Sequence, residues 1–111
     1  MANSKTGRGS TNDNARYVGI SVDTDPGASG YWSDETHARN HMGCVWLEIT
    51  SIDSATVTIQ FKAMGQSSWS TYPTTYTEVS SIKIESNPST QWRVGVEDDN
   101  QGSGVTAQIS W

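Results

Sequence analysis

The sequence predicts an all-β protein: a single antiparallel β-sandwich, Ig-like or jelly-roll-like, of about seven or eight short strands. One leucine stands beside eight valines, seven isoleucines and thirteen threonines, and branched side chains suit a pleated, half-buried surface. Short runs of alternating apolar and polar residues are separated by turn-forming residues at close intervals. The length of 111 residues fits one compact domain. Because aliphatic residues are few, the five tryptophans and four tyrosines are expected to supply much of a small core.

Residues 1–16 are polar, lack apolar periodicity and predict a flexible N-terminal arm, with residues 17–111 as the sandwich domain. The net charge of the chain is −5, and the arm carries a formal charge of +2, so residues 17–111 carry −7. Two interpretations of the arm stay open: a disordered terminus, or a segment that orders against an acidic partner surface. Its candidate contact residues are the cations Lys5, Arg8 and Arg16.

The first strand is expected over residues 17–22, where Val18, Ile20 and Val22 alternate with smaller or polar residues. Turn-forming residues follow it. Residues 31–43 then predict one short helix within a long connection, with Ser33 or Asp34 as its N-terminal cap and Gly43 at its end.

Two runs in the centre of the chain, residues 44–50 and 55–63, show the clearest alternation. The link between them is short, which predicts an antiparallel hairpin with the two strands as neighbours. Further strands are expected around residues 69–72, 76–79, 81–85, 91–96 and 105–111.

Three polar groups are candidate chemical sites: His37 and His41 with Glu35 as metal ligands, the 97–100 loop as a calcium site, and Cys44 with His41 as a dyad. The histidine pair has too few ligands for a metal, and the loop lacks the EF-hand spacing. Cys44 begins an apolar strand, and no third group orients the histidine of the dyad. The chain also lacks a phosphate-binding loop and a nucleophile elbow. The sequence therefore predicts no catalytic residues, no metal and no cofactor. The acidic body and the lack of a long apolar run predict no nucleic-acid or membrane partner.

Five aromatic residues stand outside the clean alternation, namely Tyr31 and four candidate interface residues, and they admit two interpretations. Exposed aromatic faces could stack on sugar rings, which would make the chain a carbohydrate-binding module, free or on a virion surface. Alternatively, the same rings fill the core or an interface between subunits, since few other large apolar residues exist. These candidate interface residues are Trp32, Trp69, Tyr72 and Tyr76.

The C-terminal half resembles the small β-sandwich structural proteins of tailed bacteriophages. The resemblance rests on the "TVTIQ" strand, a turn followed by Trp69 and Tyr72, the Tyr-Thr pair at 76–77, the "IKIE" strand, "QWRVGV", and a closing "G-x-T-x-x-I" strand. It implies a non-enzymatic virion protein made in the host cytoplasm: a capsid decoration (cement) protein on the head shell, a head-fibre base, or a neck or tail accessory. The implied partners are the major capsid protein or another virion protein, and further copies of the chain, with a trimer favoured for shell decoration. Glycan binding is the alternative.

Overall fold

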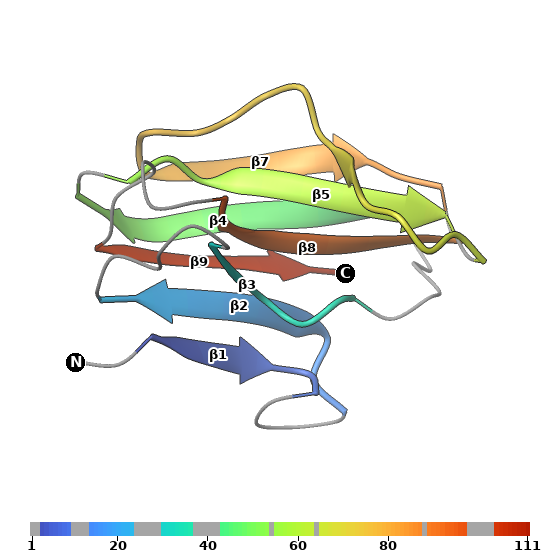
Figure 1. The fold of residues 1–111 in the computed structure, drawn as a ribbon, viewed down its shortest axis with the longest axis horizontal. Helices are drawn as coiled ribbons and strands as arrows, with labels where there is room; N and C mark the ends of the chain where they lie inside the picture. Colours follow the sequence, from blue (N-terminus) through green and yellow to red (C-terminus); the bar gives the residue numbers. More distant parts are fainter. Residues whose placement is uncertain are drawn as a thin grey trace.

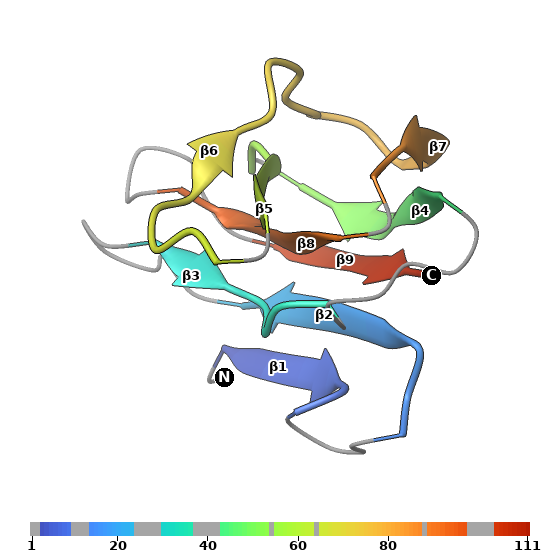
Figure 2. The same ribbon diagram turned by 90° about the vertical axis from the view of Figure 1, so that its right-hand side faces the viewer.

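The computed structural model describes residues 3–9, 14–23, 30–36, 43–53, 55–63, 65–87, 89–97 and 104–111. Within these ranges nine strands form two antiparallel sheets (Figures 1 and 2). The five-stranded sheet has the order β1-β2-β9-β4-β7, and the four-stranded sheet has the order β3-β8-β5-β6. The strands are β1 (Ser4–Gly7), β2 (Tyr17–Val22), β3 (Tyr31–Trp32), β4 (Cys44–Ile52), β5 (Thr58–Ala63), β6 (Ser70–Thr71), β7 (Ser80–Glu85), β8 (Thr90–Val96) and β9 (Val105–Ser110). The predicted all-β sandwich is confirmed.

The core lies between the sheets and is built by the expected alternation. In β2, β4 and β9, every second side chain points inward and is almost fully buried, as for Ile20, Leu47 and Ile109. The facing sheet contributes Ile59 and Val94, both fully buried. The buried cluster is mainly aliphatic, and among the described residues Trp92 is its one aromatic member. Branched aliphatics therefore fill most of the core, and rings such as Tyr31, Phe61 and Trp111 pack around its margin.

The predicted hairpin of residues 44–50 and 55–63 is wrong. Strand β4 pairs with β7 and β9, whereas β5 pairs with β6 and β8 in the other sheet. The short link therefore crosses from one sheet to the other, and Ala55 and Val57 are buried along the crossing. Alternation indicates which face of a strand is buried, but two strands on opposite sides of one core show the same alternation as two neighbours.

The helix predicted over residues 31–43 is not seen in the described part of this segment. Tyr31–Trp32 form β3, and the chain continues extended alongside β8. Ser33 and Thr36 each bond to β8 twice: their backbone N–H groups donate to Val94 and Trp92 carbonyls, and their hydroxyls accept from the N–H groups of the same two residues. This pairing satisfies the backbone without a helix. Residues 37–42 lie outside the described residues.

Part of the predicted flexible arm is a strand. Ser4–Gly7 form β1, which pairs with β2 in the register Ser4↔Ser21 to Gly7↔Val18. The polar composition gave no sign of this strand, because an added edge strand gains backbone hydrogen bonds without needing an apolar face. Residues 1–2 and 10–13 lie outside the described residues. Within the described ranges, no helix is both long and apolar enough to cross a membrane.

Candidate functional site

The outer face of the four-stranded sheet gathers aromatic and cationic side chains from four separate segments. Pairing of β3 with β8 places Trp32 opposite Gly95, and pairing of β5 with β8 places Gln60 opposite Arg93. Trp69 immediately precedes β6, which is the neighbour of β5. The outward side chains of these segments therefore meet on one surface.

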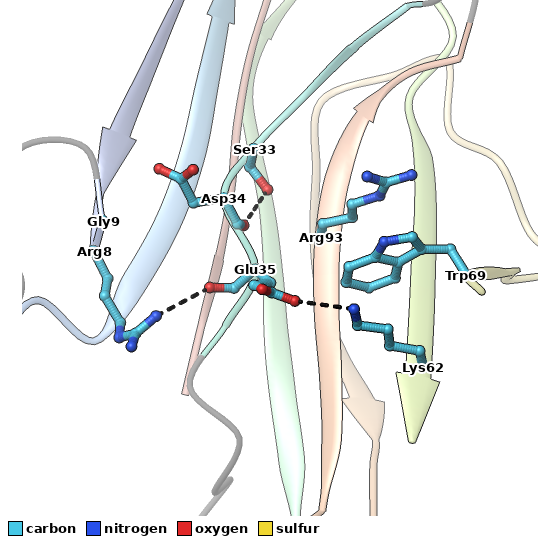
Figure 3. Close-up of a pocket in the computed structure, with 8 residues that line it drawn as sticks. All are labelled: Arg8, Gly9, Ser33, Asp34, Glu35, Lys62, Trp69 and Arg93. Carbon is cyan, nitrogen blue, oxygen red and sulfur yellow. Dashed lines mark hydrogen bonds and ion pairs between the residues drawn. The ribbon is translucent and has the colours of Figure 1, made fainter. Parts of the chain in front are cut away.

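A stack of alternating rings and cations, here called the aromatic–cation ladder, consists of Trp32, Arg93, Trp69 and Lys62. The Arg93 guanidinium carbon lies 4.5 Å from the ring centre of Trp32 and 4.5 Å from that of Trp69. Lys62 Nζ lies 4.7 Å from the Trp69 ring centre, and Figure 3 shows Lys62 and Arg93 on opposite sides of the indole. Both faces of Trp69 are thus occupied from within the chain, which leaves neither face open for stacking on a sugar.

Gly95 makes room for the ladder. A Cβ atom at this position would lie 2.6 Å from Cε3 of Trp32 and 2.3 Å from the carbonyl oxygen of Tyr31. Both distances are far below van der Waals contact, so only glycine lets β3 and the Trp32 ring approach β8 this closely. The glycine of "RVGV" therefore provides the space that the Trp32 ring occupies.

Arg93 is held in place by a second partner. Its Nε and Nη2 atoms both donate to Oε1 of Gln60, its cross-strand neighbour. Burial lowers the pKa of the Arg93 guanidinium, and the carboxylate of Glu35 opposes this shift. An arginine stays charged in proteins, so the partly buried cation depends on the two rings and the amide oxygen for its stability.

A shallow polar cavity of about 370 Å³ lies beside the ladder. Glu35 Oε2 forms an ion pair of 3.4 Å with Lys62 Nζ and makes no hydrogen bond within the described residues. Arg8 Nη1 donates to the backbone oxygen of Glu35 at 3.5 Å, and Ser33 Oγ donates to that of Asp34 at 2.9 Å. Figure 3 shows these contacts. The lining residues are Arg8, Gly9, Ser33, Asp34, Glu35, Lys62, Trp69 and Arg93.

Tyr72 and Tyr76 lie away from the ladder, at the margin of the core. Both are half-buried and pack against the buried cluster. Tyr72 meets Trp92 edge-on with ring centres 5.8 Å apart, and Tyr76 forms a backbone bridge with Val57. Figure 2 shows the chain that carries them arching between β6 and β7. The structure therefore splits the four predicted aromatics into two ladder residues and two residues of the core margin.

The three predicted arm cations each contact the chain's own sandwich. Lys5 points toward the other sheet, where its Nζ lies 3.8 Å from Oδ1 of Asp34. Arg8 lines the polar cavity. Arg16 Nε donates to the backbone oxygen of Trp111 at 3.1 Å. Lys5 and Arg8 therefore hold the N-terminal segment against the stretch that follows β3, and Arg16 contacts the residue after β9.

Of the three candidate chemical sites, the structure describes Glu35, Cys44 and Glu97. Cys44 is the single cysteine of the sequence, and its thiol is buried. His37, His41 and residues 98–100 lie outside the described residues. Among the residues that the structure describes, no group of three or more histidine, cysteine, aspartate or glutamate side chains could hold a metal ion.

Trp46 is a surface residue that sequence analysis did not single out. It lies on β4, one strand in from the β7 edge of the five-stranded sheet, and the residue is 49% exposed on the outer face. Its cross-strand neighbours are Lys83 on β7 and Ser110 on β9, and Tyr17 lies opposite Ser110 on β2. The signal was present in the sequence, because alternation sets Trp46 in phase with Glu48 rather than with Leu47.

No protein-family model matches this sequence, and no curated protein matches it. Among solved structures, Drosophila melanogaster CENP-C bound to CAL1 is similar with a TM-score of 0.49 and 9% identity, over 96% of this chain and 67% of that chain. The Drosophila melanogaster CENP-C cupin domain has a TM-score of 0.45 and 12% identity, over 89% of this chain and 61% of that chain. Likenesses this weak carry no information on what this chain binds.

Proposed function

We propose that this chain is a non-enzymatic structural protein of a tailed-phage virion, a decoration (cement) protein that docks on the head shell and associates with copies of itself. The resemblance of the C-terminal half supports the virion class. The observation that carries the docking role is the exposed Trp46 on the outer face of the five-stranded sheet.

The setting of Trp46 suits contact with a large protein surface. Around it the outer face carries mostly hydroxyl, amide and charged side chains, such as Thr106, Gln108 and Lys83. One large apolar ring within a polar rim is the usual arrangement of an interface hot spot. Within the described ranges no third layer covers this sheet face, so it presents a broad surface to a shell.

Sedimentation with undecorated phage head shells tests this role. The wild-type protein is expected to co-sediment with the shells, and Trp46→Ala to weaken binding at least about tenfold, as for a hot-spot tryptophan. Val79→Ala is the matched control, because Val79 is 64% exposed but lies just before β7, away from Trp46. Lack of wild-type co-sedimentation would contradict shell docking. Equal binding by both variants would contradict the assignment of Trp46.

Glycan binding is the second candidate, and the polar cavity is the observation that favours it. Its volume of about 370 Å³ falls in the range of small-ligand sites, and it presents both cationic and anionic groups. Because both faces of Trp69 are covered, the sugar would be held by hydrogen bonds rather than by stacking on this ring. A glycan array probed with wild-type protein and Lys62→Ala tests this, and the absence of any bound glycan would rule it out for the sugars on the array.

A further inference from the structure

Strand β7 is an open edge of the five-stranded sheet (Figure 1). The N–H of Ser86 donates to the oxygen of Gly43, so residues with even numbers direct their backbone groups toward β4. Ser81, Lys83 and Glu85 therefore direct theirs away from the sheet. Within the described ranges no strand pairs with this side of β7. The outward backbone groups of these three residues can pair with another strand.

The other three edges are less suited to pairing. β3 and β6 have two residues each, which is too short for a stable ladder. β1 directs Lys5 inward, toward Asp34, and an inward charge is a known protection of edge strands. β7 has no such feature, since its inward residues are the uncharged Ser80, Ile82 and Ile84.

The charges of β7 are self-complementary in one register. In an antiparallel pair of two β7 strands related by a two-fold axis at Ile84, Lys83 of each copy lies opposite Glu85 of the other. Both residues direct their backbone groups outward, so this pair can exchange two backbone hydrogen bonds while the side chains form an opposite-charge pair on the exposed face.

Neighbouring registers lack this match. An axis at Lys83 or at Glu85 places like charges directly opposite each other, which is destabilising. An axis at Ile82 places Lys83 opposite Ser81 and leaves Glu85 opposite Val79, so neither charge finds a partner. The charge pattern thus selects one register, whereas charges that only protect an edge would repel a second copy.

We infer that the chain self-associates by pairing β7 with β7 of a second copy about a two-fold axis at Ile84, which joins two five-stranded sheets into one continuous sheet. The axis is perpendicular to the sheet, so the outer faces of both copies point to the same side. Both Trp46 side chains then face one surface. This inference rests on the self-association part of the proposed function, and it would give shell docking two linked contacts.

Charge reversal tests the register. Analytical ultracentrifugation of the full chain is expected to show a concentration-dependent dimer, or a hexamer if a three-fold contact also forms. Lys83→Glu and Glu85→Lys each place like charges opposite and are expected to weaken the dimer about tenfold or more. The double variant Lys83→Glu/Glu85→Lys restores opposite charges in this register alone and is expected to recover wild-type association.

Circular dichroism of each variant verifies folding, which is expected to be retained because both side chains are exposed. A wild-type monomer at all concentrations would overturn the inference, as would a trimer or dimer unaffected by the single reversals. Single reversals that weaken association without rescue by the double variant would overturn the register. Shell co-sedimentation of Glu85→Lys separates the two proposals, because Glu85 pairs with Cys44 rather than with Trp46. A monomeric variant that still binds shells preserves docking, whereas a dimer that never binds shells preserves the β7 contact.

Discussion

Arg93 on β8 packs its guanidinium 4.5 Å from the ring centre of Trp32 on β3, so side-chain stacking reinforces a strand that pairs over only two residues. The same guanidinium contacts Trp69, which precedes the two-residue strand β6 at the opposite edge of the sheet. One arginine in the middle of the sheet therefore fastens both of its short edge strands. The ladder is best understood as structural support for this sheet.

Arg93→Lys is expected to lower the free energy of unfolding by about 2 kcal/mol. A lysine keeps the charge but loses the planar group that contacts two rings and the fork that meets Gln60. Chemical denaturation compares this variant with Arg16→Lys, whose exposed arginine makes a hydrogen bond to the backbone of Trp111. The control is expected to change stability by about 0.5 kcal/mol or less. Equal stabilities of the two variants would show that the ladder contributes little.

Two buried threonines are expected to respond in opposite directions to replacement by valine. Thr36 Oγ1 accepts a hydrogen bond from the N–H of Trp92, and Thr36→Val leaves that donor buried without this partner. The expected loss is about 1–3 kcal/mol. Thr58 Oγ1 is buried with no hydrogen bond in the described part of the chain, so Thr58→Val is expected to raise stability by about 1 kcal/mol. Urea unfolding measures both, and losses of similar size would contradict the assignment.

The parts of the fold that follow from local pattern were predictable from the sequence. Alternation correctly identified the buried faces of the strands that contain Val18, Leu47, Val94 and Ile109. The sandwich class followed from that pattern and from the composition. The buried faces and the sandwich class both follow from the alternation within individual strands, and each short segment of the sequence contains that alternation by itself.

The features that were missed depend on partners distant in sequence. Whether residues 44–50 and 55–63 share a sheet is decided by β8 and β9, which come much later in the chain. Ser33 has helix-capping chemistry, but β8 offers its hydroxyl and backbone another partner. The ladder likewise joins four segments whose proximity only the topology creates.

Gly95→Ala is expected to destabilise the four-stranded sheet by about 1–3 kcal/mol. The new methyl would lie 2.3 Å from the carbonyl oxygen of Tyr31 and within 2.8 Å of two atoms of the Trp32 ring, so β3 must move away from β8. Hydrogen exchange is expected to show faster exchange of amides bonded between β3 and β8, including that of Ser33. Gly65→Ala is the control, because a Cβ at this position would meet no atom within 4 Å. Its expected cost of about 1–2 kcal/mol comes from the positive φ of Gly65. The exchange of the amides between β3 and β8 is expected to stay unchanged in this control. Unchanged exchange in Gly95→Ala would refute the close contact.

Tyr76 is expected to make the protein less stable at alkaline pH. Burial raises the pKa of its hydroxyl above the ordinary value of 10.0, and the nearby Tyr72 raises it further. Above about pH 10 the unfolded chain therefore loses this proton more readily than the folded one, and the free energy of unfolding falls as pH rises.

Tyr76→Phe removes this titration, so the stability of the variant relative to wild type should increase from pH 9 to pH 11. Tyr72→Phe removes only the second cause and should reduce the alkaline loss in part. Urea denaturation at several pH values measures the difference, and parallel pH profiles for wild type and Tyr76→Phe would refute the effect.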